Sequence, residues 1–342
     1  MLNKDTISIH LVREALLQSC APGKAMDEVL HKVGIDPQLL GQPQARVPAV
    51  VYARLWRLLA RRLDDEFFGM DPRKLRHGSL AFMSRAAMVQ PTLAQGLELV
   101  LGFLSLMLER MPARLVRQQS LAEIVLHESD AGSGRAFTYF TYWMIVHGVA
   151  CWLAGRRIPI MAIELRCAAP DYCEDYEVMF SANLRFDRPR TRMIFAADCL
   201  AAPIKRSPEE LQSFLAQAPA NILVKYRDPQ SLGSQIKQDL RQLPAYQWPE
   251  TGGMAQRLCM SASTLRRRLA EEGQTWQGIK DSVRKELAIG WLAEPQLSFA
   301  DIALRLGFAE TSSFYKAFRK WSGTNPGHYR SLILQGAESP TA

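Results

Sequence analysis

The length, composition and charge of the chain indicate a folded protein of two domains. Its 342 residues are more than one ordinary domain contains. A content of 48% hydrophobic and 22% charged residues excludes wholesale disorder and a membrane bundle. The net charge of +8 is uneven, because sixteen Lys and Arg stand against eleven Asp and Glu from Asn221 onward. This excess permits a phosphate-rich partner without requiring one.

The first hundred residues carry a helical pattern and no membrane signal. In residues 91–111, leucine and valine recur at steps of three and four, which predicts a buried helix that Thr92 could cap. The longest apolar stretches, residues 99–108 and 144–155, fall short of the ~20 residues that a spanning helix needs. Polar groups interrupt the N-terminus, as a signal peptide would not allow. We therefore expect no membrane partner and a cytoplasmic, nucleoid-associated protein.

A small sheet is expected after residue 113. The segments "ARLVRQQ" and "AEIVLHE" alternate as strands do, and residues 130–134 have turn chemistry. An aromatic-rich helix follows from residue 136, and then "IMAIELRCA", "LRFDR" and "TRMIFAA" are further strand candidates. Residues 1–203 thus form an α+β domain, with helices first and the sheet after. Residues 204–230 are expected to be a linker, in which Ser207 starts a short helix.

The aromatic-rich helix offers a candidate pocket for a small-molecule effector. Tyr139, Tyr142, Trp143 and His147 would provide aromatic walls with polar tips. The alternative is that this helix packs on the sheet as ordinary core. The pattern does not distinguish a fatty acid, an amino acid, a sugar or a nucleotide messenger.

No motif points to catalysis, a metal or a cofactor. The six cysteines show no CxxC pair and no zinc spacing. A GxSxG turn, a phosphate-binding glycine loop and an HExxH helix are missing from the sequence. The acidic group Asp171, Glu174, Asp175 and Glu177 fits a solvated helix face. An enzyme remains an alternative that activity of the N-terminal domain would revive.

The last hundred residues contain an internal repeat. "MAQRLCMSASTLRRRLAEEG" and "IALRLGFAETSSFYKAFRKWSG" each place an alanine three residues before a leucine, then a turn, then an apolar pair four residues apart. Those pairs are Leu265 with Leu269 and Phe314 with Phe318. A small inward residue, a tight turn and an anchored second helix define a helix-turn-helix motif. Gly307 suits the second turn, whereas Cys259 holds that position in the first.

The outer faces of the two second helices carry polar and basic side chains. With the apolar pairs buried, the first helix presents Ser263, Arg266, Arg267 and Arg268, and the second presents Thr311, Ser312, Lys316, Arg319 and Lys320. Arginine can bind a guanine edge through two hydrogen bonds, and Ser or Thr can meet a base or a phosphate. The repeat therefore predicts a double major-groove reader. An interaction module whose basic helices meet an acidic protein is the alternative, which a shallow salt dependence would favour.

These motifs resemble a known family. "SFADIALRLGFAETSSFYKAFRKWSGTNPGHYR" is similar to the second helix-turn-helix and terminal signature of the AraC/XylS transcription regulators, and "MAQRLCMSASTLRRRLAEEGQTWQGIKDSVRKELAIGWL" resembles the first with its linker helix. "FFGM", "HGSLAFMSRAA", "PTLAQGLELVLGF" and "DYEVMFSANLRFDRPRTRMIFAADCLAAPI" resemble the arabinose-binding-type sensor domain of that superfamily. The resemblance implies a sensor domain followed by an all-α DNA-binding domain over residues 231–335.

The resemblance also implies site residues and partners. Two motifs joined by a rigid helix at residues 276–292 would enter neighbouring major-groove segments of double-stranded DNA, ~34 Å apart. Base contacts would come from Ser263, Arg266, Arg267, Thr311, Ser312 and Lys316, and phosphate contacts from Lys280, Arg319 and Lys320. Lys316 stands where many members have Arg, and Cys259 replaces the usual small turn residue. The further expected partners are a small-molecule effector, a second copy of the chain and, for an activator, RNA polymerase.

Overall fold

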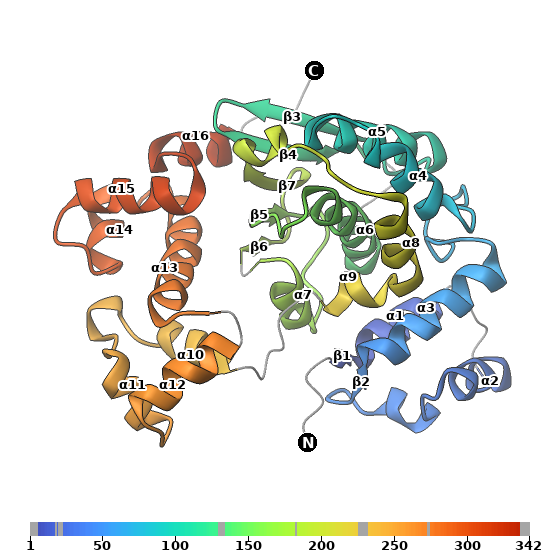
Figure 1. Ribbon diagram of the computed structural model, residues 1–342, viewed down its shortest axis with the longest axis horizontal. Coiled ribbons are helices and arrows are strands. Elements are labelled where there is room, and N and C mark those ends of the chain that lie inside the picture. The colour runs from blue at the N-terminus through green and yellow to red at the C-terminus, as the bar shows by residue number, and fades with distance from the viewer. Residues whose placement is uncertain are drawn as a thin grey trace. The chain divides into compact units, whose positions relative to one another are not determined.

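The computed structural model describes residues 6–17, 19, 23–128, 134–181, 183–224, 232–271 and 274–335. Its internal contacts divide the chain into two units, Met1–Tyr226 and Arg227–Ala342 (Figure 1). Across the described ranges, every helix is too short or too polar to cross a membrane.

The N-terminal unit opens with helices and a two-stranded ribbon. Strand β1 (Thr6–Ser8) pairs antiparallel with β2 (Arg46–Pro48). The helices are α1 (Ile9–Leu17), α2 (Lys24–Val33), the 3-10 turn η1 (Pro37–Gly41), α3 (Ala49–Leu63), α4 (Ser79–Met88) and α5 (Leu93–Met107). The helical prediction is confirmed, and the ribbon is an addition to it. Thr92 precedes α5, but its hydroxyl donates to Gln95 Oε1 at 3.1 Å instead of capping the helix.

A five-stranded sheet follows, as the alternating segments predicted. Its order is β3 (Ala113–Gln118), β4 (Leu121–Leu126), β7 (Thr191–Ala196), β5 (Ile160–Glu164) and β6 (Leu184–Arg185). Only the β5–β6 pair is parallel. Helices α6 (Ala136–Ala154) and α7 (Cys173–Met179) and the 3-10 turn η2 (Ala197–Ala201) lie between or after these strands. Of the predicted turn at residues 130–134, only Gly134 is among the described residues.

The core of this unit lies between the sheet and helices α5 and α6 (Figure 1). Ile124, Ile163 and Met193 are directly paired or adjacent across the strands and point to this side. Every residue of α6 from Ala136 to Leu153 is buried. A helix that is apolar all round is one that its neighbours surround. Helix α6 is therefore a core helix from Ala136 to Leu153.

The chain after residue 203 differs from the predicted linker. Helices α8 (Pro208–Gln217) and α9 (Ala220–Val224) pack on the N-terminal unit. Ser207 and Glu210 form a capping box that starts α8, and Phe214 stacks on Trp152 of α6 with ring centroids 4.8 Å apart. Apolar burial holds this segment on α6, so its described part belongs to the N-terminal unit. The structure does not describe residues 225–231.

The C-terminal unit is helical in its described ranges, 232–271 and 274–335. Its elements are α10 (Leu232–Arg241), η3 (Ala245–Gln247), α11 (Thr251–Arg257), α12 (Ala262–Glu271), α13 (Trp276–Leu292), α14 (Phe299–Arg305), α15 (Thr311–Ser322) and α16 (Pro326–Gln335). The long helix α13 contacts α10 on one side of the unit and α14, α15 and α16 on the other. It has the bounds expected of the rigid joining helix.

Candidate nucleic-acid interface

The two turns of the repeat close with the same hydrogen bonds. In the first, Met260 N donates to Ala255 O at 2.9 Å; in the second, Phe308 N donates to Ala303 O at 2.9 Å. The central residue of each turn is left-handed, with φ of 52° at Cys259 and 78° at Gly307. This closure is a helix C-cap of the Schellman type. The repeat in the sequence is thus a repeat of backbone geometry, in spite of the cysteine.

Buried anchors fix which face of each second helix points outward. Leu265 and Leu269 of α12 and Phe314 and Phe318 of α15 are at most 1% exposed. Phe318 packs near Tyr329 of α16, with ring centroids 5.9 Å apart. Since residues four apart lie on one face of a helix, the polar residues between the anchors must face away from the core. The helix phase inferred from the sequence is confirmed.

Helix α12 presents the predicted residues of the first motif. Ser263, Arg266 and Arg267 are exposed, as is Arg268. Arg267 forms an ion pair with Glu271 one turn later, at 2.7 Å, and the Ser263 hydroxyl lies 2.8 Å from that of Ser261. The Arg266 side chain makes no hydrogen bond or ion pair with a described residue. A neighbouring carboxylate therefore holds the guanidinium of Arg267, whereas Arg266 and Arg268 have no hydrogen bond or ion pair with a described residue.

Helix α15 presents those of the second motif. Ser312, Lys316, Arg319 and Lys320 are exposed, and Thr311 is half-buried. The Ser312 hydroxyl donates to the carboxylate of Glu310, the residue before the helix, at 3.0 Å. Lys280, predicted as a phosphate contact, is half-buried near the start of α13 with its ammonium 5.6 Å from the Trp276 ring centre.

A residue that the sequence analysis did not single out joins the two motifs. Arg284 of α13 donates from Nε to Leu306 O at 3.1 Å, and its guanidinium lies 5.1 Å from the ring centre of Trp248 and 5.6 Å from that of Phe308. Burial lowers the pKa of Arg284. Gly307 also approaches the first half, because a Cβ placed on it would lie 3.6 Å from Ala245. The motifs therefore form one body.

The four candidate pocket residues in the N-terminal unit are all buried in α6. The Tyr139 hydroxyl donates to Glu128 at 2.7 Å, and His147 donates from Nε2 to Ile158 O at 2.8 Å. Burial lowers the pKa of His147 to about 4, so its ring is neutral at physiological pH. The Tyr142 hydroxyl and Trp143 Nε1 have no hydrogen-bond partner among the described residues. Of these four side chains, that of His147 lines the cavity described next.

One small cavity does lie at the His147 end of α6. It has a volume of about 20 Å³ and is lined by His147, Gly148, Cys151, Arg157, Phe214, Asn221 and Ile222. Such a volume holds about one water molecule. Ile222 of α9 closes it tightly, because a Cβ on Gly148 would lie 2.7 Å from Ile222 Cγ2. An effector could occupy this place only if α9 moved.

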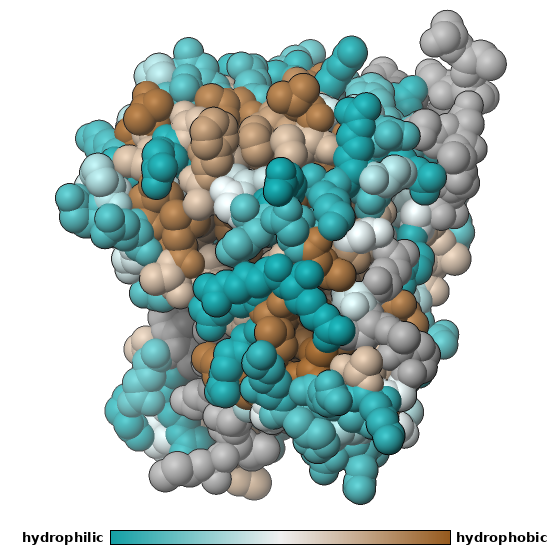
Figure 2. All heavy atoms as spheres, turned by 90° about the vertical axis from the view of Figure 1, so that its right-hand side faces the viewer, coloured by the Kyte–Doolittle hydropathy of each residue, from teal (hydrophilic) through white to brown (hydrophobic). Residues whose placement is uncertain are grey.

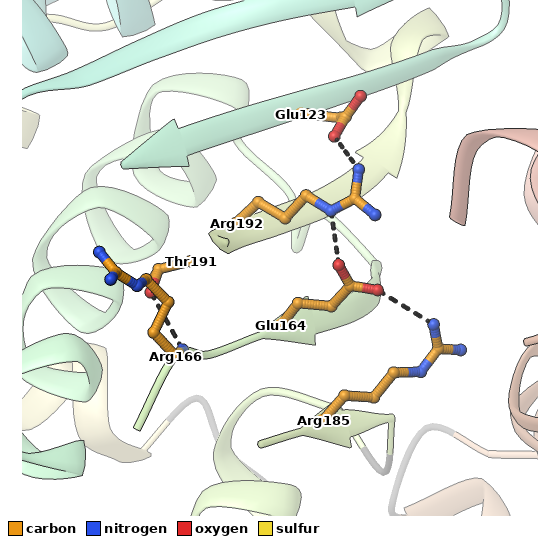
Figure 3. Close-up of polar contacts among 6 residues, drawn as sticks. All are labelled: Glu123, Glu164, Arg166, Arg185, Thr191 and Arg192. Carbon is orange, nitrogen blue, oxygen red and sulfur yellow. Dashed lines mark hydrogen bonds and ion pairs between the residues drawn. The ribbon is translucent and has the colours of Figure 1, made fainter. Parts of the chain in front are cut away.

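The sheet face opposite the core carries a buried charge network (Figure 3). Arg192 donates to Glu164 at 2.6 Å and to Glu123 at 2.7 Å, and Arg185 donates to the second oxygen of Glu164 at 3.2 Å. Burial lowers the pKa of Arg192, but the two carboxylates raise it further, and the net shift is upward. Two Arg and two Glu balance in charge, and the network ties four strands together. Arg192 Nη2 is buried and has no hydrogen-bond partner among the described residues.

Cys151, Cys167, Cys173, Cys199 and Cys259 are free thiols. No group of three His, Cys, Asp or Glu side chains within the described ranges could hold a metal ion. In the acidic group, Asp175 forms an ion pair with Arg46 at 2.9 Å, which is a structural role.

Comparison with known proteins finds one family for both units. The model described as "Arabinose-binding domain of AraC transcription regulator" matches residues 23–204, and a "Helix-turn-helix domain" model matches residues 254–331. The ornithine utilization regulator of Pseudomonas aeruginosa is 25% identical over 321 residues, which are 93% of this chain and 94% of that protein. The regulator VqsM of the same species is 32% identical over 182 residues, 52% of this chain and 55% of VqsM. The crystal structure of the P. aeruginosa regulator CdpR aligns with 89% of this chain and 96% of its own, at 20% identity and a TM-score of 0.30.

Proposed function

Since this chain belongs to the AraC family of DNA-binding transcription regulators, we propose that α12 and α15 enter two neighbouring major-groove segments of one operator. The observation that carries this proposal is the matched geometry of the two motifs. Both turns close alike, both second helices are anchored by buried apolar pairs, and both turn basic side chains to solvent. The Arg284 joint keeps their mutual orientation.

The proposed contacts divide into base readers and phosphate contacts. Ser263, Arg266 and Arg267 would read the first segment, and Thr311, Ser312 and Lys316 the second. Arg319, Lys320 and Lys280 would bind phosphates, which orient the protein without reading sequence. Arg266 has its guanidinium unengaged by the described residues, whereas Arg267 must leave Glu271 to reach a base. This competition supports Arg266 as the stronger reader of the two.

The N-terminal unit is proposed to sense the effector. The buried polar tips of Tyr142 and Trp143 and the cavity beneath Ile222 support a site on α6. In this proposal His147 belongs to the cavity wall, and Tyr139 holds Glu128 in place. Binding of the effector would displace α9. Because α9 ends at Val224 and the C-terminal unit begins at Arg227, the displacement would act on the chain next to that unit. We further propose a homodimer in the cytoplasm, associated with the nucleoid, contacting RNA polymerase where it activates; no catalysis is assigned.

The test is a genome-wide DNA pull-down with full-length protein, followed by a salt titration of the best-enriched fragment. Six to ten phosphate contacts would lower affinity by ~10³ to 10⁵ between 50 and 200 mM salt. A shared motif of two short elements one helical turn apart is the expected result. A shallow slope without sequence preference would instead favour a protein-interaction module.

A further inference from the structure

Helices α4 and α5 carry exposed apolar side chains that the described chain leaves uncovered. Phe82 of α4, Leu106 of α5 and Val89 between the helices are 63%, 72% and 72% exposed. These are three of the seven large exposed hydrophobic residues in the described ranges, so exposure is concentrated here. Figure 2 shows hydrophobic side chains gathered over the upper part of the face on which α4 and α5 lie.

The apolar surface is continuous across the two helices. The Phe82 and Phe103 rings are in contact, with centroids 5.8 Å apart. On α5, Leu99, Gly102, Phe103 and Leu106 follow the steps of three and four that form one helical stripe. Gly102 leaves the middle of the stripe open, since an added Cβ would meet nothing within 4 Å. We name this surface, made by Phe82, Val89, Leu99, Gly102, Phe103 and Leu106, the α4–α5 face. Contiguous exposed apolar surfaces mark binding sites for partners.

Opposite charges border the α4–α5 face. Arg85 of α4 and Glu98 of α5 are exposed, and neither has an ion pair or hydrogen bond with a described side chain. The contacting rings of Phe82 and Phe103 mark the sides on which the helices meet. At about 100° per residue, Arg85 lies about 60° from Phe82 around α4, and Glu98 about 140° from Phe103 around α5. The face thus has a positive edge on α4 and a negative edge on α5.

We propose that the α4–α5 face binds the same face of a second copy of this chain. A twofold axis that lies in the contact plane and runs between the two helices would bring Arg85 of each copy to Glu98 of the other, so both unpaired charges gain a partner. A surface with one edge of each sign is complementary to itself after such a rotation. The proposal deepens the proposed homodimer by naming its contact surface, and it does not depend on DNA binding.

The experiment is sedimentation equilibrium of the full-length protein, without DNA, over a wide concentration range. Leu106→Asp is expected to shift a dimer to monomer, because it places a carboxylate within the apolar contact. Val50→Asp is the matched control: Val50 is 52% exposed on α3 and should leave the dimer unchanged.

Exchanging the charges at Arg85 and Glu98 tests the proposed contact between the two copies more directly. Arg85→Glu and Glu98→Arg should each raise the dimer dissociation constant about tenfold, because each places like charges together. The double variant should restore the wild-type constant. A monomer at all concentrations, or a dimer that none of these variants changes, would overturn the proposal. The salt-dependent DNA affinity of the wild-type protein is measured separately, since its absence would contradict the proposed function and not the α4–α5 contact.

Discussion

Arg284 and Leu306 are joined by a hydrogen bond that links the helix between the motifs to the turn of the second motif. The donor Nε and the carbonyl oxygen are 3.1 Å apart. The same guanidinium lies over Trp248 from the first half and Phe308 from the second. One side chain therefore contacts both halves of the C-terminal unit, and the orientation of α12 relative to α15 depends on it.

Arg284→Met should lower the free energy of unfolding of the C-terminal unit by about 2–4 kcal/mol. A hydrogen bond from a charged donor contributes about 1.5–3 kcal/mol, and each ring contact about 0.5–2 kcal/mol. Urea unfolding, monitored by hydrogen exchange of the amides in the C-terminal unit, measures the decrease in the free energy of unfolding. Arg268→Met is the control, since Arg268 is exposed and should change stability by less than about 0.5 kcal/mol. Equal effects of the two substitutions would contradict the role of Arg284.

Gly307→Ala should destabilise the same unit by about 1–2 kcal/mol, because an L-residue is strained at a φ of 78°. The new Cβ would make only an ordinary contact with Ala245 at 3.6 Å, so the penalty is in the backbone. Cys259→Ala in the equivalent turn should be nearly neutral, because that turn already holds an L-residue. The same unfolding measurement compares them; a larger loss for Cys259→Ala would show that the two turns are not equivalent.

Arg267→Ala should weaken binding to the cognate operator by about 1–3 kcal/mol and relax preference at one or two base pairs. Lys320→Ala should weaken binding to all sequences alike and reduce the salt slope by about one. Binding titrations on the operator and on its single-base variants distinguish the two roles.

Glu271→Gln should raise the affinity for the operator, because it releases Arg267 and removes a negative charge. A fall in affinity would mean that the ion pair positions Arg267 for contact.

His147 makes stability depend on pH below neutrality. Burial lowers its pKa to about 4, whereas an unfolded histidine titrates near 6.5. Between these values the unfolded state binds a proton that the native state does not, so the contribution is complete above pH ~6.5 and decreases by up to about 1.4 kcal/mol per pH unit toward pH ~4. His147→Gln keeps a donor for Ile158 and should flatten this decrease. The free energies of unfolding of the wild type and of His147→Gln are measured from pH 4 to 8, and their difference gives the contribution of His147. Parallel curves would show that His147 titrates normally.

Local patterns predicted most of the elements and the outward faces of the second helices. Phe314 and Phe318 could be assigned to the core because an apolar pair four residues apart defines a helix face. The role of Arg284 could not be predicted. An arginine one residue after buried Val283 gives no signal that it binds the carbonyl of Leu306, twenty-two residues away. For the same reason the sequence gives no sign that Phe214 packs on Trp152, and residue types alone predict a linker after residue 203. The pocket prediction used residue types alone, which do not reveal that α6 is surrounded on all sides.

The joint at Arg284 and Gly307 has a consequence for the operators that such a protein can recognise. If the two readers cannot move independently, the distance and rotational phase between their target elements are fixed along with the bases. Inserting one base pair between the elements turns the second by about a tenth of a helical turn and moves it by about 3.4 Å, and it would cancel one whole set of contacts. A base change inside one element removes only a single contact. The operators of this protein should therefore vary more in the base sequence of each element than in the spacing between the two elements.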